Sequence, residues 1–151
     1  MRLSSLTRPE LIFPDLEAPD GRTVLETLAG KVAAAGAAPD ADLLFLRLAE
    51  REALGSTGIG GGVAIPHCKL AGISRAILAI GIAPQGVDYG AVDHQPVRLF
   101  FLVVSPSQSP AEHLQVLAAI SRWVRFEGRV GRLLAERDPQ AVYDLFLASE
   151  S

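Results

Sequence analysis

The sequence predicts a single α/β (α+β) domain over residues 1–151, with a central sheet flanked by helices on both sides. Apolar segments with a helical period alternate with apolar segments of strand length, and no repeat or low-complexity linker interrupts them. Two of the strand-length segments are apolar throughout, which is typical of strands buried on both faces. With 49% hydrophobic and 21% charged residues, a chain of 151 residues suffices for one full core, whereas two independent domains would be cramped.

Two helices are predicted in the N-terminal half of the chain. Apolar residues recur at helical spacing over 23–35, and the pattern stops at Gly36. Asp40 is suited to cap a second helix over 41–54, which ends before Gly55.

Three segments are predicted to be strands. The shortest, 63–65, leads to His67 at its end. The other two, 76–83 and 97–104, are the segments that are apolar throughout. Between them, residues 85–96 are rich in turn formers and leave room for one further short strand.

The clearest helix start lies at residues 109–112, where Ser-Pro-Ala-Glu forms a capping-box pattern with proline at the first helical position. His113 therefore lies in the first turn, close to free backbone N–H groups and the positive end of the helix dipole. A last helix is predicted to begin at Asp138. The residues expected to face the core are Leu114, Leu117, Ile120 and Val124 in the first of these helices and Val142, Leu145 and Phe146 in the second.

Arginine recurs every three or four residues toward the end of the helix that carries His113: Arg122, Arg125, Arg129 and Arg132. An unbroken helix would align them as a basic stripe, but Gly128 predicts a break, so a solvated face is expected. Trp123 and Phe126 lie off the predicted core stripe. We expect them to close the core from the side rather than to anchor a partner.

Charge and composition exclude several classes of protein. The net charge of −3 gives no broad basic surface for nucleic acid. Cys68 is the only cysteine, so an internal disulfide is impossible and a reducing compartment fits. No apolar run approaches the roughly 18 residues needed to span a bilayer, and the first residues lack the apolar stretch of a signal peptide. We expect a soluble cytoplasmic protein, peripheral to a membrane at most.

The strongest chemical signal is the segment 54–70, LGSTGIGGGVAIPHCKL. Glycine lets the backbone approach an anion closely and direct successive N–H groups at it. Histidine titrates near neutral pH, so a large fraction of an exposed imidazole is neutral and nucleophilic. The pattern predicts that His67 takes up a phosphoryl group, with Thr57, Gly58 and Gly60 as candidate phosphate-binding residues.

Three segments together resemble a known family: EREALGSTGIGGGVAIPHCKL, GVDYGAVDHQPVRLFFLVVSP and AEHLQVLAAIS. They look like the signature blocks of the mannitol/fructose-type IIA domains of the bacterial phosphoenolpyruvate-dependent phosphotransferase system. The stand-alone length and the motif GSTGIG…AIPH most resemble the nitrogen-regulatory branch of this family. The resemblance covers nearly the whole chain and implies a mixed sheet between helices.

The resemblance also implies roles for individual residues. His67 corresponds to the histidine that accepts a phosphoryl group, on Nε2, from a phosphohistidine of the carrier HPr or its nitrogen-branch counterpart. His113, Arg51 and Thr57 correspond to further family positions. Such a transfer needs positioning and charge stabilisation, which a forked arginine and a second imidazole can supply without a metal or other cofactor. Cys68 departs from the glycine that is common after the histidine in such domains.

Other functions stay open from the sequence. A IIA component of a sugar transporter would pass the phosphoryl group to a separate IIB domain, whereas a regulatory protein would use it as a switch toward a transporter or kinase. Because no IIB or membrane domain is fused to these residues, we favour regulation. A binding module that is never phosphorylated is a further alternative. A metal-dependent hydrolase using His67, His94 and His113 is disfavoured, because no HxxxH or clustered carboxylate pattern supports it.

Overall fold

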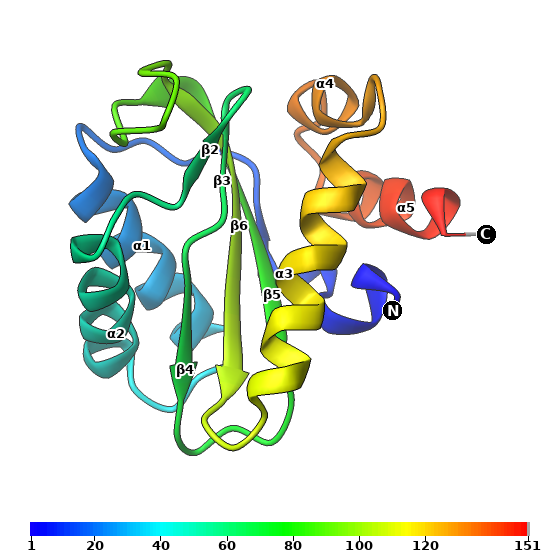
Figure 1. Ribbon diagram of the computed structural model, residues 1–151. Helices are drawn as coiled ribbons and strands as arrows, with labels where there is room; N and C mark the ends of the chain where they lie inside the picture. Colours follow the sequence, from blue (N-terminus) through cyan, green and yellow to red (C-terminus); the bar gives the residue numbers. More distant parts are fainter. Residues whose placement is uncertain (151) are drawn as a thin grey trace.

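The protein, a computed structural model that describes residues 1–150, has a six-stranded sheet between two layers of helices (Figure 1). The long strands β5 (Ile77–Val87) and β6 (Val97–Pro106) pair antiparallel at its centre. β1 (Ile12–Phe13) runs parallel to β5 at one edge. On the other side of β6 lie the remaining strands: β2 (Gly58–Gly60), β3 (Val63–Ala64) and β4 (His67–Leu70). β3 and β4 pair parallel with β6, and β2 pairs antiparallel with β3, so the sheet is mixed as expected.

Helices cover both faces of the sheet, which confirms the predicted fold class. One face carries α1 (Gly21–Ala34) and α2 (Ala41–Ala53). The opposite face carries α3 (Pro110–Val124), α4 (Arg129–Leu134) and α5 (Pro139–Ser149). Two short 3-10 turns, Leu3–Leu6 and Pro9–Leu11, precede β1. No helix within residues 1–150 is both long and apolar enough to cross a membrane.

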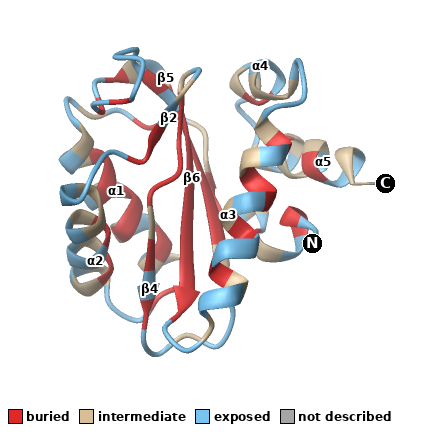
Figure 2. Ribbon diagram, in the orientation of Figure 1, coloured by how far each residue is buried: buried red, intermediate tan, exposed pale blue. Residues whose placement is uncertain are grey.

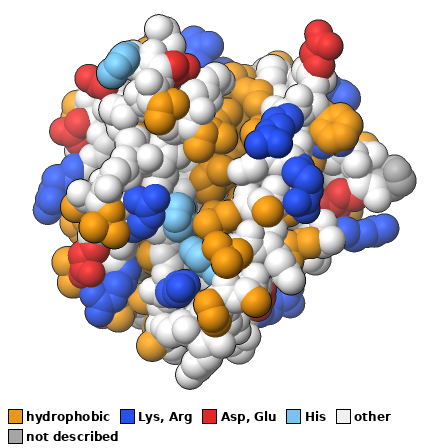
Figure 3. Space-filling view, viewed as in Figure 1, with side chains coloured by type: hydrophobic (Ala, Val, Ile, Leu, Met, Phe, Trp, Pro, Cys, Tyr) orange, Lys and Arg blue, Asp and Glu red, His pale blue; other side chains and the backbone are white. Residues whose placement is uncertain are grey.

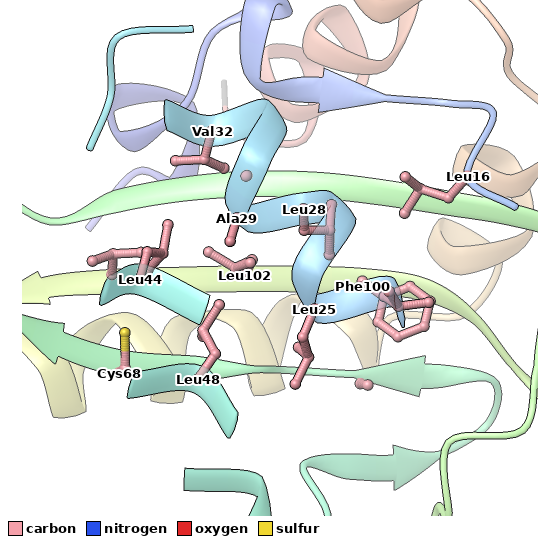
Figure 4. Close-up of a cluster of buried hydrophobic side chains, with 14 of the residues drawn as sticks. Leu16, Leu25, Leu28, Ala29, Val32, Leu44, Leu48, Cys68, Phe100 and Leu102 are labelled. Carbon is pink, nitrogen blue, oxygen red and sulfur yellow. The ribbon is translucent and has the colours of Figure 1, made fainter. Parts of the chain in front are cut away.

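The core consists of two hydrophobic clusters, one on each face of the sheet, and β6 contributes to both. Alternate residues of a strand point to opposite faces, so Phe100 and Leu102 pack under α1 and α2, while Phe101 and Val103 pack under α3 and α5. Figure 2 shows β6 buried along almost its whole length, and Figure 4 shows the first cluster. The apolar pattern of 97–104 therefore predicted its burial correctly.

The chain around His67 differs from the expected arrangement. The segment 63–65 does not end at His67; instead His67 begins a separate strand, β4, that continues along β6. Pro66 separates the two strands because it has no N–H to donate, although its carbonyl accepts a hydrogen bond from the Val103 N–H at 2.9 Å. The turn-rich segment 85–96 holds no strand of its own, since only its start belongs to β5.

The start of α3 was predicted correctly, but the predicted capping box does not form. Pro110 is the first helical residue, yet the Ser109 side chain makes no capping hydrogen bond. Glu112 Oε1 instead accepts a hydrogen bond from the backbone N–H of Ala76 at 3.2 Å, which ties the helix start to the segment before β5. Asp40 and Asp138 do cap α2 and α5, as predicted.

The buried face of α3 is also rotated relative to the prediction. Leu114 is 67% exposed and lies outside the core. The helix instead buries His113, Val116, Ala119, Ile120 and Trp123. These positions recur at three- and four-residue spacing and form one stripe. Since the stripe begins at His113, helix packing presses this histidine against the sheet.

The arginine-rich region has the predicted break. α3 ends at Val124, and α4 begins after Gly128, which has a φ of 84°. Trp123 is buried, as expected, and its indole N–H donates to the Ser149 hydroxyl at 2.9 Å. Phe126 was expected in the core but is 61% exposed, with the Arg129 guanidinium 4.1 Å from its ring centre.

Candidate functional site

Two hydrogen bonds fix the orientation and the tautomer of the His67 ring. Its Nδ1 lies 2.7 Å from the Ile65 carbonyl oxygen, and a carbonyl can only accept, so Nδ1 carries the proton. Its Nε2 lies 3.2 Å from the Arg51 Nε–H, which donates to it. Both contacts require the same tautomer, in which Nε2 holds the free lone pair. The nucleophilic nitrogen of His67 is therefore Nε2.

Arg51 reaches His67 from the last turn of α2. Its Nη1 donates to the Gly55 carbonyl at 2.9 Å, which holds the guanidinium over the end of the helix. Within residues 1–150, the ion pairs are Arg8–Glu10 and Arg47–Glu50, so no carboxylate neutralises Arg51. An arginine with spare N–H donors and an unpaired charge is suited to bind phosphoryl oxygens.

His113 is the second imidazole of the site. It is only 6% exposed, and its Nδ1 lies 2.7 Å from the Ser105 hydroxyl. The His113 and His67 rings have centroids 5.4 Å apart and are tilted by 52°. The first turn of α3 thus brings a buried imidazole to the histidine at the start of β4, although 46 positions separate them in the sequence.

Both imidazoles are held in their neutral forms. Burial lowers the pKa of His67, and the Arg51 charge acts in the same direction, whereas the hydrogen bond to Ile65 opposes them. Burial lowers the pKa of His113 to about 4, and the charges of His67 and Lys69 add to this effect. At neutral pH, a neutral His67 keeps its lone pair available for attack.

The two histidines open into a recess of about 640 Å³. Arg47, Arg51 and Lys69 line it, and its single acidic residue, Glu50, is paired with Arg47 at 2.7 Å. Figure 3 shows two histidines side by side in the middle of this face, with basic side chains around them. The recess combines a nucleophilic nitrogen with excess positive charge, which suits a phosphoryl group.

Three predicted phosphate-binding residues do not line this recess. Thr57 is buried; its N–H donates to Glu52 Oε2 at 3.1 Å, and its hydroxyl donates to Glu52 Oε1. Gly58 and Gly60 form β2, away from the two imidazoles. A side chain on Gly58 would place its Cβ 2.7 Å from the Ala91 Cβ, so close packing accounts for this glycine.

The third histidine does not line the recess, and Cys68 borders it while its thiol packs in the core. His94 is exposed in the turn-rich segment 88–96 and does not line the recess. Cys68 points to the opposite face of the sheet from His67, where it packs beside Leu44 and Leu48 (Figure 4). Burial raises the pKa of the Cys68 thiol to about 12. No cluster of three or more potential metal-ligating side chains occurs in the part of the chain that the structure describes.

Sequence reasoning missed three residues near the site: Ser105, which contacts the His113 ring, and Glu52 and Tyr89, which hydrogen-bond to each other beside Thr57. Glu52 lies directly after Arg51, yet its position in a charged ERE stretch resembles an ordinary solvated helix end. Ser105 lies within an apolar strand, where a fully buried hydroxyl must find a partner. That requirement was the only signal in the sequence that pointed toward it.

Comparison with known families agrees with this geometry. The family model for the EIIA 2 component of the phosphoenolpyruvate-dependent sugar phosphotransferase system matches residues 5–149. The chain belongs to this family.

Similar proteins of this IIA family include both regulatory and sugar-specific members. A nitrogen regulatory protein of Bradyrhizobium diazoefficiens is 37% identical over 96% of this chain and 94% of its own length. A fructose-specific EIIA component of Haloferax volcanii is 34% identical over 95% of this chain and 93% of its own length. Among solved structures, the nitrogen regulatory protein IIA-Ntr of Neisseria meningitidis superposes with a TM-score of 0.87 at 27% identity, over 95% of this chain and 98% of that one.

These relatives confirm two expectations from the sequence: the IIA family and its mixed α/β fold. The chain is a IIA component of a phosphotransfer system, and it matches the two relatives named above over 94% and 93% of their own lengths.

Proposed function

We propose that His67 accepts a phosphoryl group on Nε2 from a phosphohistidine of an HPr-like carrier protein. The observation that carries this proposal is the pair of hydrogen bonds on the His67 ring, which leaves the lone pair on the nitrogen that faces Arg51. Membership of the IIA family supports the class of reaction. The excess of basic residues around the recess supports an anionic group at this position.

The proposed step requires no proton to leave His67. The Nε2 lone pair forms a bond to phosphorus while the P–N bond on the donor imidazole breaks, and the donor ring takes back that electron pair. His67 keeps its Nδ1 proton, and the Ile65 carbonyl that accepts this hydrogen bond stabilises the positive charge that the ring acquires. Such a transfer has a loose transition state, so positioning and charge stabilisation dominate its rate.

Arg51 and His113 are assigned to the phosphoryl oxygens. Arg51 must release Nε2 when phosphorus approaches; its Nε–H is then free to donate to a phosphoryl oxygen while Nη1 stays on Gly55. For His113, a hydrogen bond from the Ser105 hydroxyl to Nδ1 would place the ring proton on Nε2, from which it can be donated to the same group.

We further propose that this protein uses the phosphoryl group as a regulatory switch. Two relatives at 37% and 34% identity are nitrogen regulatory proteins, and they match nearly the full chain. A phosphoryl group on His67 would cancel much of the local excess of positive charge, and this changes which partner surfaces can bind. The alternative, donation to a sugar-specific IIB domain, is supported by the fructose-specific relative at 34% identity.

A reconstituted transfer assay tests both proposals. The purified protein is incubated with phosphoenolpyruvate, enzyme I and either a sugar-branch or a nitrogen-branch carrier, and acid-labile phosphate is measured. One phosphate per chain is expected in the wild type and none in His67→Ala. Label that persists in His67→Ala would overturn the assignment of the acceptor. Rapid onward transfer to a fructose-type IIB domain would favour transport over regulation.

A further inference from the structure

Glu52 follows Arg51 in the sequence but points away from the recess. Its carboxylate accepts hydrogen bonds from the Thr57 N–H at 3.1 Å, from the Thr57 hydroxyl, and from the Tyr89 hydroxyl at 2.8 Å. The Thr57 and Tyr89 hydroxyl oxygens also lie 3.4 Å apart. Three donors converging on one half-buried carboxylate make a closed network behind the recess.

This network fixes the loop that holds Arg51. Thr57 is bound to Glu52 through both its backbone and its side chain, so residues 55–57 cannot move independently of α2. Gly55 is the first residue of that loop, and its carbonyl oxygen accepts the hydrogen bond from Arg51 Nη1 at 2.9 Å. The contacts therefore lead from Tyr89 through Glu52 to Thr57, and along the backbone of the loop to the Gly55 carbonyl that holds Arg51.

The same network also separates two neighbouring charges. A carboxylate free to turn toward the recess would compete with a phosphoryl group for the Arg51 guanidinium. The donors on Glu52 hold its charge on the Tyr89 side, and Arg51 is left without an ion pair among the described residues. Adjacent residues of a helix already point about 100° apart, and the donors from Thr57 and Tyr89 hold the Glu52 carboxylate in that direction.

We infer that Glu52, together with Thr57 and Tyr89, positions Arg51 for phosphoryl transfer to His67. These three are positioning residues, because they touch neither His67 nor the proposed phosphoryl group. The inference rests on the proposed function. It assigns to Thr57 a role behind the site in place of the direct phosphate contact expected from the sequence.

The test compares Thr57→Val, which removes the hydroxyl at nearly constant volume, with Thr57→Ser, which retains it. Steady-state transfer from a phosphorylated HPr-like carrier is measured for both. Because a misplaced catalytic group costs rate, kcat should fall about tenfold in Thr57→Val while KM stays within about twofold. Thr57→Ser should keep nearly the wild-type kcat. Asp93→Ala, which removes a loop contact to the Gly61 N–H at 3.0 Å but none to Arg51, is the matched control.

A double-mutant cycle distinguishes positioning from general destabilisation. If Thr57 acts through Arg51, Thr57→Val should change the rate less than about twofold in an Arg51→Ala background. An unchanged tenfold loss in that background, or no loss in Thr57→Val alone, would overturn the inference. If either of these results were found while phosphorylation still required His67, the inference about Thr57 would fail but the proposed function of His67 would stand.

Two more variants keep the test decisive if Thr57→Val fails to fold. Tyr89→Phe keeps the ring, which packs 5.3 Å from Phe100, and removes one donor to Glu52, so a smaller loss of kcat is expected. Glu52→Gln removes a negative charge near the site. If Glu52 acted only through its charge, this variant would speed the transfer of an anionic group, whereas positioning predicts a slower transfer. Faster transfer in Glu52→Gln would contradict the inference.

Discussion

The chain from α2 to β4 contributes to two regions that use their polar groups in opposite ways. One region is the Gly-rich hairpin of β2 and β3, in which backbone groups already have partners. The Gly58 N–H donates to the Ser56 hydroxyl, and the Gly61 N–H donates to Asp93. In the flanking recess, Arg51 has no ion pair among the described residues, and the His67 lone pair meets only a displaceable N–H. A site for a phosphoryl group requires donors and a nucleophile that have no strong partner within the protein. A Gly-rich sequence alone does not supply such groups.

The largest expected effect comes from Arg51. Removing a preorganised donor from a charge-stabilising site typically costs about 10²–10³ in rate, so Arg51→Ala should slow phosphorylation by that order. Arg51→Lys should restore only part of the rate, because lysine keeps the charge but loses the fork. Arg47→Ala is the control, since Arg47 lines the same recess but is paired with Glu50. Equal losses in the Arg51 and Arg47 variants would indicate a general charge effect.

Replacement of the second imidazole should have a smaller effect. His113→Gln keeps an N–H donor but changes its position, and we expect the phosphorylation rate to fall about 10- to 100-fold because one stabilising hydrogen bond is lost. The measurement is rapid-mixing labelling with a phosphorylated carrier. His94→Gln is the matched control, because His94 is exposed and does not line the recess. A wild-type phosphorylation rate in His113→Gln would contradict the role assigned to His113.

The hairpin should show the reverse behaviour. In Gly58→Ala, the new Cβ would lie 2.7 Å from the Ala91 Cβ, so we expect destabilisation of about 1–3 kcal/mol by overpacking. Thermal unfolding measures this loss. Phosphorylation of the folded fraction should stay within about twofold of wild type, since Gly58 does not line the recess. A large loss of phosphorylation rate with unchanged stability would indicate that the hairpin does contact the phosphoryl group.

The last prediction concerns the pH dependence of stability. The pKa of His113 is lowered in the folded state from 6.5 to about 4, so the unfolded chain binds this proton more readily. Stability should therefore be fully present above about pH 6.5 and decline as the pH falls toward 4. His113→Gln should flatten this decline, and the lowered pKa of His67 should account for part of what remains. Chemical denaturation at a series of pH values measures how the free energy of unfolding changes with pH in the wild type and in His113→Gln. The same slope in both proteins would contradict the lowered pKa of His113.

Much of the fold could be predicted because its signals are local. Asp40 and Asp138 marked two helix starts, and the apolar run 97–104 marked the central strand. The burial of α3 could not be predicted as well, because Leu114 fits a helical stripe in the sequence but lies on the outer side once His113 packs on the sheet. Helical periodicity alone does not show which of two adjacent stripes meets the neighbouring layer.

The site was predictable in part for the same reason. The Gly-rich motif pointed to His67, whereas Arg51 was identified only through the family resemblance; the structure brings the two side chains within 3.2 Å of each other. The assignment of the glycines to phosphate binding rested on the Gly-rich pattern, and that of Thr57 also on the family resemblance. Neither shows that the Thr57 hydroxyl already donates to Glu52. Partners from distant segments, such as Tyr89 and Ser105, become visible only when the chain is folded.

The central claim is that Nε2 of His67 accepts the phosphoryl group, and long-range ¹H–¹⁵N correlation NMR of the phosphorylated protein tests it most directly. In the unphosphorylated protein, the His67 signals should show a proton on Nδ1 and none on Nε2. After phosphorylation, coupling to phosphorus should appear on Nε2 of His67 while Nδ1 stays protonated. Phosphorus coupling on Nδ1 of His67, or on either nitrogen of His113, would contradict the account.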